Sequence, residues 1–487
     1  MEKRSGNREN QAQHKLIGKA PLVWELFQRN GDDFMPNNTS YMTEGPLLKK
    51  ILLYTFPIIL TGILQLLFNA ADLVVVGRCC GRLSVAAVGA TGAIINLITN
   101  LFIGLSVGAG VTVAHALGAG RSEDVSRTVH TAVPTAFVSG IILTIVGIFG
   151  SETFLRLMGT PSDVIGLSAT YMRIYFCGIT ASMLYNFGAA ILRAAGDTRS
   201  PLYFLTASGI VNVILNLIFV IIFDLDVAGV AIATAVSQIV SAVLIIRALM
   251  KRKDACRLSL RKMKFHRKQF SKILQIGFPA GIQGSLFSIS NVIIQSSINS
   301  FGSVAVSGNS AAGNIEGFVY MSMNSYSQTS VNFTGQNHGA GKLDRLKKIM
   351  IICLISVFCT GFTLGVLARL FGKPLLSFYI PDDAEAISYG LTRMTYICIP
   401  YFLCGLMDVT TGLIRGIGYS ILPMIITIAG VCGMRIVWIY TIFRIPKYHT
   451  LQNLYLSYTI SWSLTFITEL VVFLILLHKL QKKARSA

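Results

Sequence analysis

The chain has 487 residues, of which 53% are hydrophobic and only 13% are charged. Soluble domains carry about 25% charged residues, so the composition excludes an ordinary soluble protein. The formal net charge of +20 would suit a nucleic-acid binder, but the cations cluster in alternate loops between apolar runs, which is the positive-inside pattern of membrane proteins. We therefore expect an all-α polytopic membrane protein with no nucleic-acid partner.

The first 41 residues are polar and aperiodic, and they predict a disordered cytoplasmic tail. Beyond them apolar runs recur, each long enough to cross about 30 Å of hydrocarbon as a helix. Lipid admits only helices or closed barrels, and these runs are too long and too apolar for barrel strands. Twelve spans are predicted, at residues 51–76, 85–116, 128–148, 168–192, 201–223, 227–250, 270–297, 304–333, 349–371, 387–414, 421–443 and 455–477.

The first span contains an acid, Asp72, together with Pro57. A carboxylate at membrane depth is costly unless it faces protein, water or an ion, so Asp72 is a candidate functional residue. It can load and release a proton, or coordinate Na⁺ together with neutral oxygen donors. Pro57, like Pro279 early in the seventh span, removes a backbone hydrogen bond and permits bending. We expect bending at Pro57 to be coupled to the charge of Asp72.

Polar side chains also occur on the fifth and sixth spans. Asn212 and Asn216 have the i, i+4 spacing that places them on one helix face, and Thr234 adds a hydroxyl from the next span. These residues are candidates for the same cation site as Asp72. The alternative is that the asparagines only form interhelical hydrogen bonds.

The second half contains further intramembrane acids. Glu316 and Asp408 are candidates for ion coupling or substrate binding, and Glu469 lies in the last span. The eighth span is the weakest by hydropathy, and its polar stripe suits either a hydrated cavity or close helix packing. The residues expected to line a substrate cavity are Gln65, Asn69, Tyr320, Asn324 and Gln328.

The most basic loop sets the orientation. Residues 247–272 contain nine cations besides their two end residues, so this loop is predicted to be cytoplasmic, and alternation then places both termini on the same side. The predicted organisation is a tail at 1–41, an N-lobe at 42–250, a basic linker at 251–269, a C-lobe at 270–480 and a short tail at 481–487.

The two halves repeat each other. Short motifs recur at matching places in each half at an offset of 222 residues, or 221 in one case. Six spans per copy give both copies the same orientation, related by an axis along the membrane normal, as in many secondary transporters. The matching motifs are Phe56-Pro57 with Phe278-Pro279, residues 193–196 with 415–418, Pro201 with Pro423, and residues 118–121 with 339–342.

Enzyme signatures are missing from the sequence. There is no GxxxxGK[ST] phosphate loop, no Ser/His/Asp arrangement and no metal-ligand pair at helical spacing. We therefore expect no enzymatic activity, no cofactor and no metal other than Na⁺. Gly104 and Gly108 form a GxxxG pair in the second span, which favours close helix packing over a dimer face.

These motifs together resemble the multidrug and toxic compound extrusion (MATE) family. The resemblance rests on the duplicated twelve-span plan and on NAADLVVVG at 69–77, AAVGATG at 86–92, GAGR at 118–121 and RAAGDTRSP at 193–201. It implies a cation site in the first lobe at Asp72, Asn212, Asn216 and Thr234. Asn216 replaces a second acid of the family pattern, which leaves the choice between H⁺ and Na⁺ open.

The resemblance also implies a function. A member of this family is expected to be a monomeric antiporter of the cell membrane, in contact with membrane lipid, that exports organic cations or amphipathic drugs in exchange for H⁺ or Na⁺ by alternating access. Metabolites remain alternative substrates. The competing hypotheses are a flippase for lipid-linked saccharides, which would need cavity-facing arginines such as Arg173, Arg393 or Arg435, and a channel or receptor without coupled transport.

Overall fold

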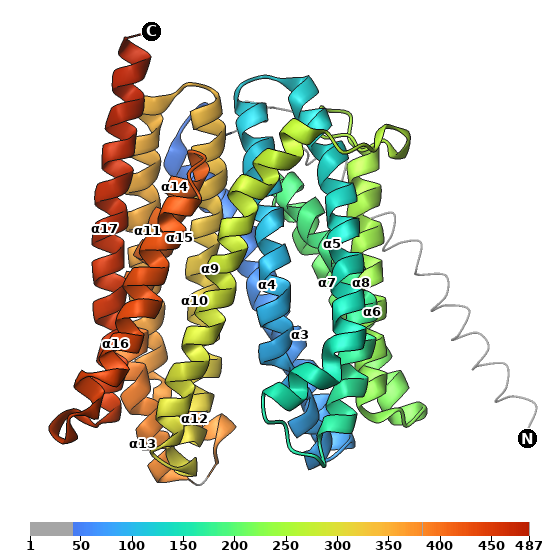
Figure 1. Ribbon diagram of the computed structural model, residues 1–487, viewed down its shortest axis with the longest axis vertical. Coiled ribbons are helices and arrows are strands. Elements are labelled where there is room, and N and C mark those ends of the chain that lie inside the picture. Colours follow the sequence, from blue (N-terminus) through green and yellow to red (C-terminus); the bar gives the residue numbers. More distant parts are fainter. Residues whose placement is uncertain (1–41, 382, 487) are drawn as a thin grey trace, which may run out of the picture. The chain divides into compact units, whose positions relative to one another are not determined.

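The computed structural model describes residues 42–381 and 383–486, and the predicted tail at 1–41 lies outside them. The described residues form helices without a β-strand, and the long helices lie side by side along a common direction (Figure 1). Ten described helical segments are long and apolar enough to cross a membrane. The expected all-helical fold is therefore confirmed, whereas the count of twelve spans stays a prediction.

Six of these helices form the first half of the chain. Each coincides with one of the first six predicted spans. The helices extend beyond the predicted bounds by one to nine residues, except that the fifth ends in a π-helical turn, η1 (Ile218–Ile222). The helices are α3 (Leu47–Cys79), α4 (Arg82–Gly118), α5 (Ser122–Leu157), α6 (Ile165–Ala194), α7 (Arg199–Leu217) and α8 (Asp226–Lys251).

The second half contains more interruptions. The predicted span at 387–414 changes winding at η3 (Met394–Cys398) and η4 (Ile399–Tyr401), where Pro400 lacks the N–H that a regular helix needs. The predicted span at 421–443 contains the π-helical turn η5 (Ile428–Gly433). The helices are α9 (Arg267–Asn299), α10 (Ser303–Gly339), α11 (Leu343–Leu370), α12 (Gly372–Tyr379), α13 (Ala384–Arg393), α14 (Phe402–Gly416), α15 (Ile421–Thr427), α16 (Met434–Tyr440) and α17 (Leu451–Arg485).

Helices α9 and α10 fall on the predicted seventh and eighth spans but are more polar than the ten apolar segments. They are nonetheless continuous over 33 and 37 residues. The polar side chains of α10 turn back onto its own backbone: the amide nitrogens of Asn332 and Asn337 donate to the carbonyls of Gln328 and Phe333 at 2.9 and 2.8 Å. Such bonds satisfy buried polar groups within the helix, so its polarity is compatible with burial.

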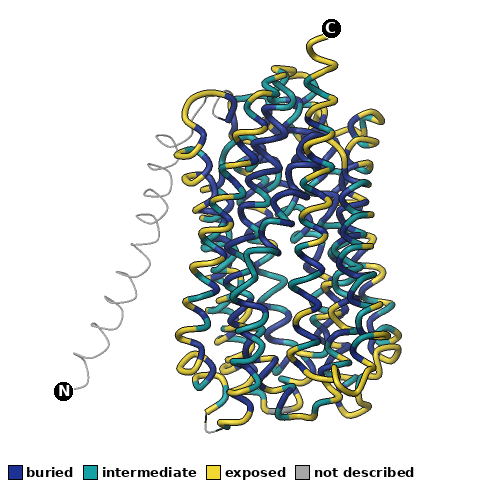
Figure 2. Tube along the Cα trace, turned by 90° about the vertical axis from the view of Figure 1, so that its left-hand side faces the viewer, coloured by how far each residue is buried: buried dark blue, intermediate teal, exposed yellow. Residues whose placement is uncertain are grey.

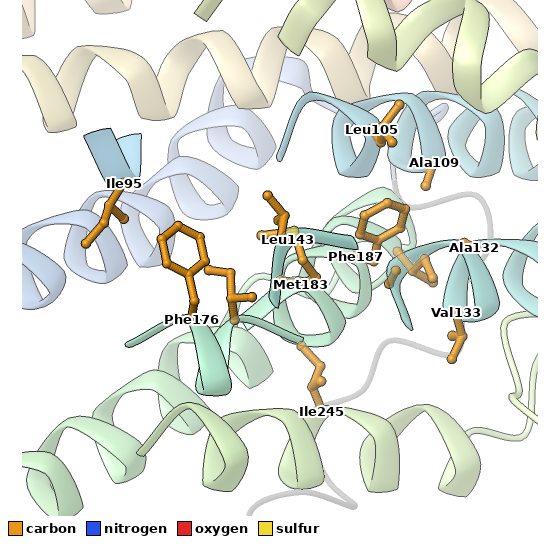
Figure 3. Close-up of a cluster of buried hydrophobic side chains, with 14 of the residues drawn as sticks. Ile95, Leu105, Ala109, Ala132, Val133, Leu143, Phe176, Met183, Phe187 and Ile245 are labelled. Atoms are coloured by element: carbon orange, nitrogen blue, oxygen red, sulfur yellow. The ribbon is translucent and has the colours of Figure 1, made fainter. Parts of the chain in front are cut away.

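The core of the first half is apolar. Ile95 and Leu105 of α4, Phe176 of α6 and Ile245 of α8 belong to one cluster of buried side chains, which fills the space between these helices (Figure 3). Buried stretches lie inside the bundle, and exposed ones lie on its outer faces and at its ends (Figure 2). Many exposed residues are large and apolar, such as Phe149 at 81%, as expected of surfaces that face lipid.

Helices α4 and α9 join the two halves through glycines. A Cβ atom on Gly104 would lie 2.2 Å from the backbone nitrogen of Gly281, and one on Gly108 would lie 2.2 Å from the carbonyl oxygen of Ile273. Gly277 and Gly281 form a second pair with GxxxG spacing on α9. The predicted packing role of the Gly104 and Gly108 pair is confirmed, and its partner is a helix of the same chain.

The repeated GAGR-type motifs also meet each other. A Cβ on Gly118, at the end of α4, would lie 2.0 Å from the carbonyl oxygen of Gln336, and one on Gly339, at the end of α10, would lie 2.2 Å from that of His115. The glycine of each motif thus packs against the backbone of the helix that carries the other motif. The halves are in close contact at the end of the bundle that carries these motifs.

Candidate functional site

Asp72 is the start of a chain of polar contacts between three helices. The amide nitrogen of Asn216 on α7 donates to Oδ1 of Asp72 on α3 and to Oδ1 of Asn212, the latter at 3.4 Å. The amide nitrogen of Asn212 in turn donates to the Thr234 hydroxyl on α8 at 3.4 Å. The structure therefore brings together all four residues that the resemblance assigned to a cation site.

These four hydrogen-bonded side chains also contain oxygen atoms that can accept a proton or bind a cation. Asn212 and Asn216 are buried, Asp72 is half-buried, and Asn216 Oδ1 is a buried atom without a hydrogen-bond partner among the described residues. The Thr234 hydroxyl donates to the Val230 carbonyl at 2.9 Å and accepts from Asn212, which leaves one of its two lone pairs for another group. Carboxylate, amide and hydroxyl oxygens are hard ligands, so this set fits a proton or a hard cation.

The local backbone changes just beyond this site. Helix α7 ends at Leu217, directly after Asn216, and continues as the π-helical turn η1. Such turns occur frequently at functional sites because they change the direction of the side chains that follow. Sequence periodicity did not indicate this turn, since residues 214–223 read as an ordinary apolar helix.

The predicted cavity residues separate into two groups. On α10, Gln328 donates to Asn324 at 3.1 Å and Asn324 donates to the Tyr320 hydroxyl at 3.5 Å. The Arg193 guanidinium of α6 donates to Gln328 Oε1 at 2.8 Å, which connects this stripe to the first half. In contrast, Gln65 and Asn69 on α3 are exposed, and no hydrogen bond within the described part of the chain joins them to the stripe.

Arg193 was not among the predicted site residues. The signal that would have indicated it is the repeat, because Arg193 corresponds to Arg415 at the 222-residue offset. Arg415 likewise donates to a glutamine, Gln283 on α9, at 2.6 Å. The two arginines are equivalent in the repeat but their partners are not, because Gln328 lies in the opposite half from Arg193 and Gln283 lies in the same half as Arg415.

Glu316 is held in an ion pair. Arg393 Nε and Nη2 donate to its two carboxylate oxygens at 2.7 and 2.6 Å, and Arg393 also donates to Asn309. The pair borders a cavity of about 240 Å³. A carboxylate that is paired in this way has its charge already balanced, so the geometry favours substrate binding or a structural role over ion coupling. Aromatic rings of the same cavity are Tyr401, Tyr458 and Trp462.

Asp408 lies apart from Glu316, on α14. Its Oδ2 atom is buried and lacks a hydrogen-bond partner among the described residues. The prolines expected to permit bending, Pro57 and Pro279, lie inside α3 and α9. The structure therefore groups the four predicted cation-site residues of the first half into one site. It does not bring Glu316 and Asp408 of the second half together in the same way.

Comparison with known proteins identifies the family. The MatE family model matches residues 57–218 and 279–441, which are corresponding parts of the two repeat copies. The chain belongs to the MATE family. Among curated relatives, the probable multidrug resistance protein YoeA of Bacillus subtilis (strain 168) is 27% identical over 409 residues, which are 82% of this chain and 88% of that protein. The probable multidrug resistance protein NorM of Thermotoga maritima is 25% identical over 396 residues, covering 80% and 84% of the two chains.

Another relative of this MATE chain bears a different name. The FAD transporter of Shewanella oneidensis is 27% identical over 333 residues, covering 66% of this chain and 72% of that protein. Among solved structures, a crystal structure of a MATE protein in the bent conformation has a TM-score of 0.84 at 22% identity, covering 93% of this chain and all of that chain. The straight conformation has a TM-score of 0.82 at 22% identity, covering 92% and 100%. The shared fold is that of MATE transporters.

Proposed function

We propose that this MATE chain is a secondary active antiporter of the cell membrane, which exports organic cations or amphipathic drugs in exchange for H⁺ or Na⁺. Both termini would be cytoplasmic, and two six-helix lobes of a monomer would give alternating access. The observation that carries the proposal is the hydrogen-bonded chain from Asp72 through Asn216 and Asn212 to Thr234. It offers a single carboxylate and several oxygen ligands to a small cation.

Ion binding at Asp72 has a direct structural consequence. The Asn216 amide is the donor that ties the Asp72 carboxylate to α7. A proton or Na⁺ on that carboxylate competes with this hydrogen bond, so binding loosens α3 from α7. Pro57 lies in the same helix, and its missing N–H lowers the cost of bending. The bend then changes the surface that α3 presents to the substrate.

The contacts between the halves support an outward-facing state. The glycine contacts at Gly118 and Gly339 lie where α4 ends and α5 begins. The basic linker packs at this same end of the bundle, because the Lys264 amide donates to the His130 carbonyl of α5. If this end is cytoplasmic, as its charge predicts, the pathway is closed toward the cytoplasm. Substrate release in this state is then directed outward.

The surroundings of the three candidate arginines do not favour a flippase for phosphate-bearing lipids. Arg393 is paired with Glu316, and Arg173 lies 3.4 Å from Glu152 on an exposed surface. Arg435 is buried, with its guanidinium 4.0 Å from the Tyr458 ring centroid. Carboxylates thus compete with a phosphate for Arg393 and Arg173, whereas the buried Arg435 has no carboxylate partner among the described residues.

Efflux of ethidium from a bacterium that lacks its own drug exporters tests the proposal. The wild-type chain is expected to lower cellular ethidium fluorescence, and Asp72→Asn is expected to behave like the empty host. Asp163→Asn, at an exposed loop position, is the control and should retain wild-type efflux. Full efflux by Asp72→Asn would overturn the proposed coupling role.

A further inference from the structure

The basic linker between the two halves exposes apolar side chains as well as cations. Residues 260–265 are all exposed, and among them Leu260, Met263 and Phe265 have exposed fractions of 51%, 41% and 48%. The connection between α8 and α9 lies at the end of the bundle, at its outer edge (Figure 1). A basic loop that only set the orientation of the chain would need its cations but not these three side chains.

The cations of the linker have no acidic partners. Six of them lie within residues 257–268, and this stretch contains no acid. All six are exposed, and none forms an ion pair within 4.0 Å in the part of the chain that the structure describes. The one acid of the linker, Asp254, is bound by Arg252 Nε at 3.0 Å. The six cations are Arg257, Arg261, Lys262, Lys264, Arg267 and Lys268.

Hydrogen bonds to α5 set the depth of this stretch. The Lys264 amide donates to the His130 carbonyl at 3.3 Å, and the His266 amide donates to the Thr131 hydroxyl at 3.2 Å. His130 follows Ser122, the first residue of α5, by eight residues, which is about 12 Å along a helix. The linker therefore lies beside α5, at the level where the predicted span at 128–148 begins. This level is the boundary between lipid headgroups and hydrocarbon.

The backbone of the linker is fixed on both sides of the exposed residues. Before them, the Leu258 amide donates to the Leu249 carbonyl of α8 at 3.0 Å, and the Leu258 side chain is buried. After them, the Phe265 ring packs edge-on against the Phe270 ring of α9, with 5.7 Å between the centroids. Exposure of Leu260 and Met263 is thus a property of the folded chain.

An anionic membrane surface satisfies both kinds of side chain. Each Lys or Arg near such a surface raises the affinity about fivefold. Apolar side chains between the cations enter the boundary of the acyl chains, as in interfacial anchors, and the long stems of Lys and Arg let their charges stay among the headgroups. A nucleic acid would use the cations but leave the three apolar side chains in water.

We propose that residues 257–268 form an interfacial anchor, which binds the headgroups of anionic phospholipids while Leu260, Met263 and Phe265 enter the acyl boundary. Because α9 begins at Arg267, the anchor also fixes the depth at which the second half starts. The inference goes beyond the proposed antiport function and does not depend on it.

Hydrogen exchange of the full-length chain in lipid bilayer discs tests the anchor without requiring transport. One set of discs contains only phosphatidylcholine, which has no net charge, and the other also contains anionic phosphatidylglycerol. Amides of residues 257–268 should exchange about tenfold or more slowly in the anionic discs, given the fivefold effect of each cation. Residues 342–348, a second basic stretch, should exchange equally in the two kinds of disc.

Two sets of substitutions separate the apolar contribution from the charge. Replacing all three apolar residues by Ser keeps every cation, and with them the orientation signal, but should abolish the difference between the discs. Replacing the three central cations by Gln should lower the bound-to-free ratio about a hundredfold. The substitutions are Leu260→Ser, Met263→Ser and Phe265→Ser in one variant and Arg261→Gln, Lys262→Gln and Lys264→Gln in the other.

A matched control removes exposed cations elsewhere on the same side of the bundle. The double variant Lys347→Gln, Lys348→Gln alters two exposed positions at the start of α11 and should keep the wild-type difference between the discs. Since all substituted side chains are exposed, the three variants should unfold in detergent at the wild-type temperature.

Three outcomes would overturn the proposal. Equal exchange of residues 257–268 in the two kinds of disc would show that anionic lipid does not bind there. An undiminished difference in the triple Ser variant would reduce the effect to charge alone. Equally slow exchange in lipid-free detergent would mean that the chain itself covers these residues. Failure of ethidium efflux would refute the antiport proposal but leaves the exchange result unaffected.

Discussion

The glycine contact between α4 and α9 gives a sharp test of how the halves are held together. An alanine at position 108 would place its Cβ 2.2 Å from the carbonyl oxygen of Ile273, whereas ordinary van der Waals contact begins at 3.4 Å. The two helices must therefore separate by about 1.2 Å, the difference between these distances. Because the obstructing atoms belong to the backbone, a side-chain rotation cannot relieve the clash. Overpacking of this kind costs about 1–3 kcal/mol.

The assay compares Gly108→Ala with Gly89→Ala on the same helix. A Cβ on Gly89 would have no heavy atom within 4 Å, so this control should keep or slightly raise stability, by about 0.5–1 kcal/mol from the gain in helix propensity. We expect Gly108→Ala to lower the unfolding temperature of the purified protein and to reduce ethidium efflux, while Gly89→Ala retains both. Equal stability and efflux in the two variants would refute the close contact between these helices.

Two further predictions concern charged and titratable groups. Removing the guanidinium in Arg393→Ala leaves the buried Glu316 carboxylate unpaired and should destabilise the protein by about 3–5 kcal/mol. The double variant Glu316→Gln, Arg393→Met should lose less, and equal losses in unfolding temperature would contradict this reasoning. In the linker, burial raises the pKa of the Cys256 thiol from 9.0 to about 12, and the nearby Asp254 charge adds to the shift. Since the folded state holds this proton more tightly, its contribution is complete below about pH 9 and is lost as the pH rises toward 12. Maleimide at about pH 8 should therefore spare Cys256 in the folded protein, and rapid labelling of this thiol would contradict its burial.

The sequence predicted the helical elements well, because apolar runs of this length admit few other structures in a membrane. It also placed Asn212 and Asn216 on one face from their spacing alone. The pairing of Asn216 with Asp72 spans 144 residues, so it followed only from the family resemblance. The change of winding around Pro400 was not predicted, because an apolar run does not reveal a local change in hydrogen bonding.

The contacts of the second half were the least accessible from the sequence. Glu316 and Arg393 lie 77 residues apart, and nothing in their spacing indicates an ion pair. Glu469 was recognised as an intramembrane acid, but its partners come from α14 and α15, which the crossing of three helices brings together. Long-range contacts between polar side chains depend on helix rotation and depth, which hydropathy does not determine.

The most direct test of the central claim is ethidium uptake into inside-out membrane vesicles under an imposed gradient of one ion at a time. A proton or a sodium gradient should drive uptake by the wild-type chain, and Asp72→Asn should abolish the driven component. Uptake that is equal with and without each gradient, or equal in the wild-type and Asp72→Asn proteins, would contradict the claim.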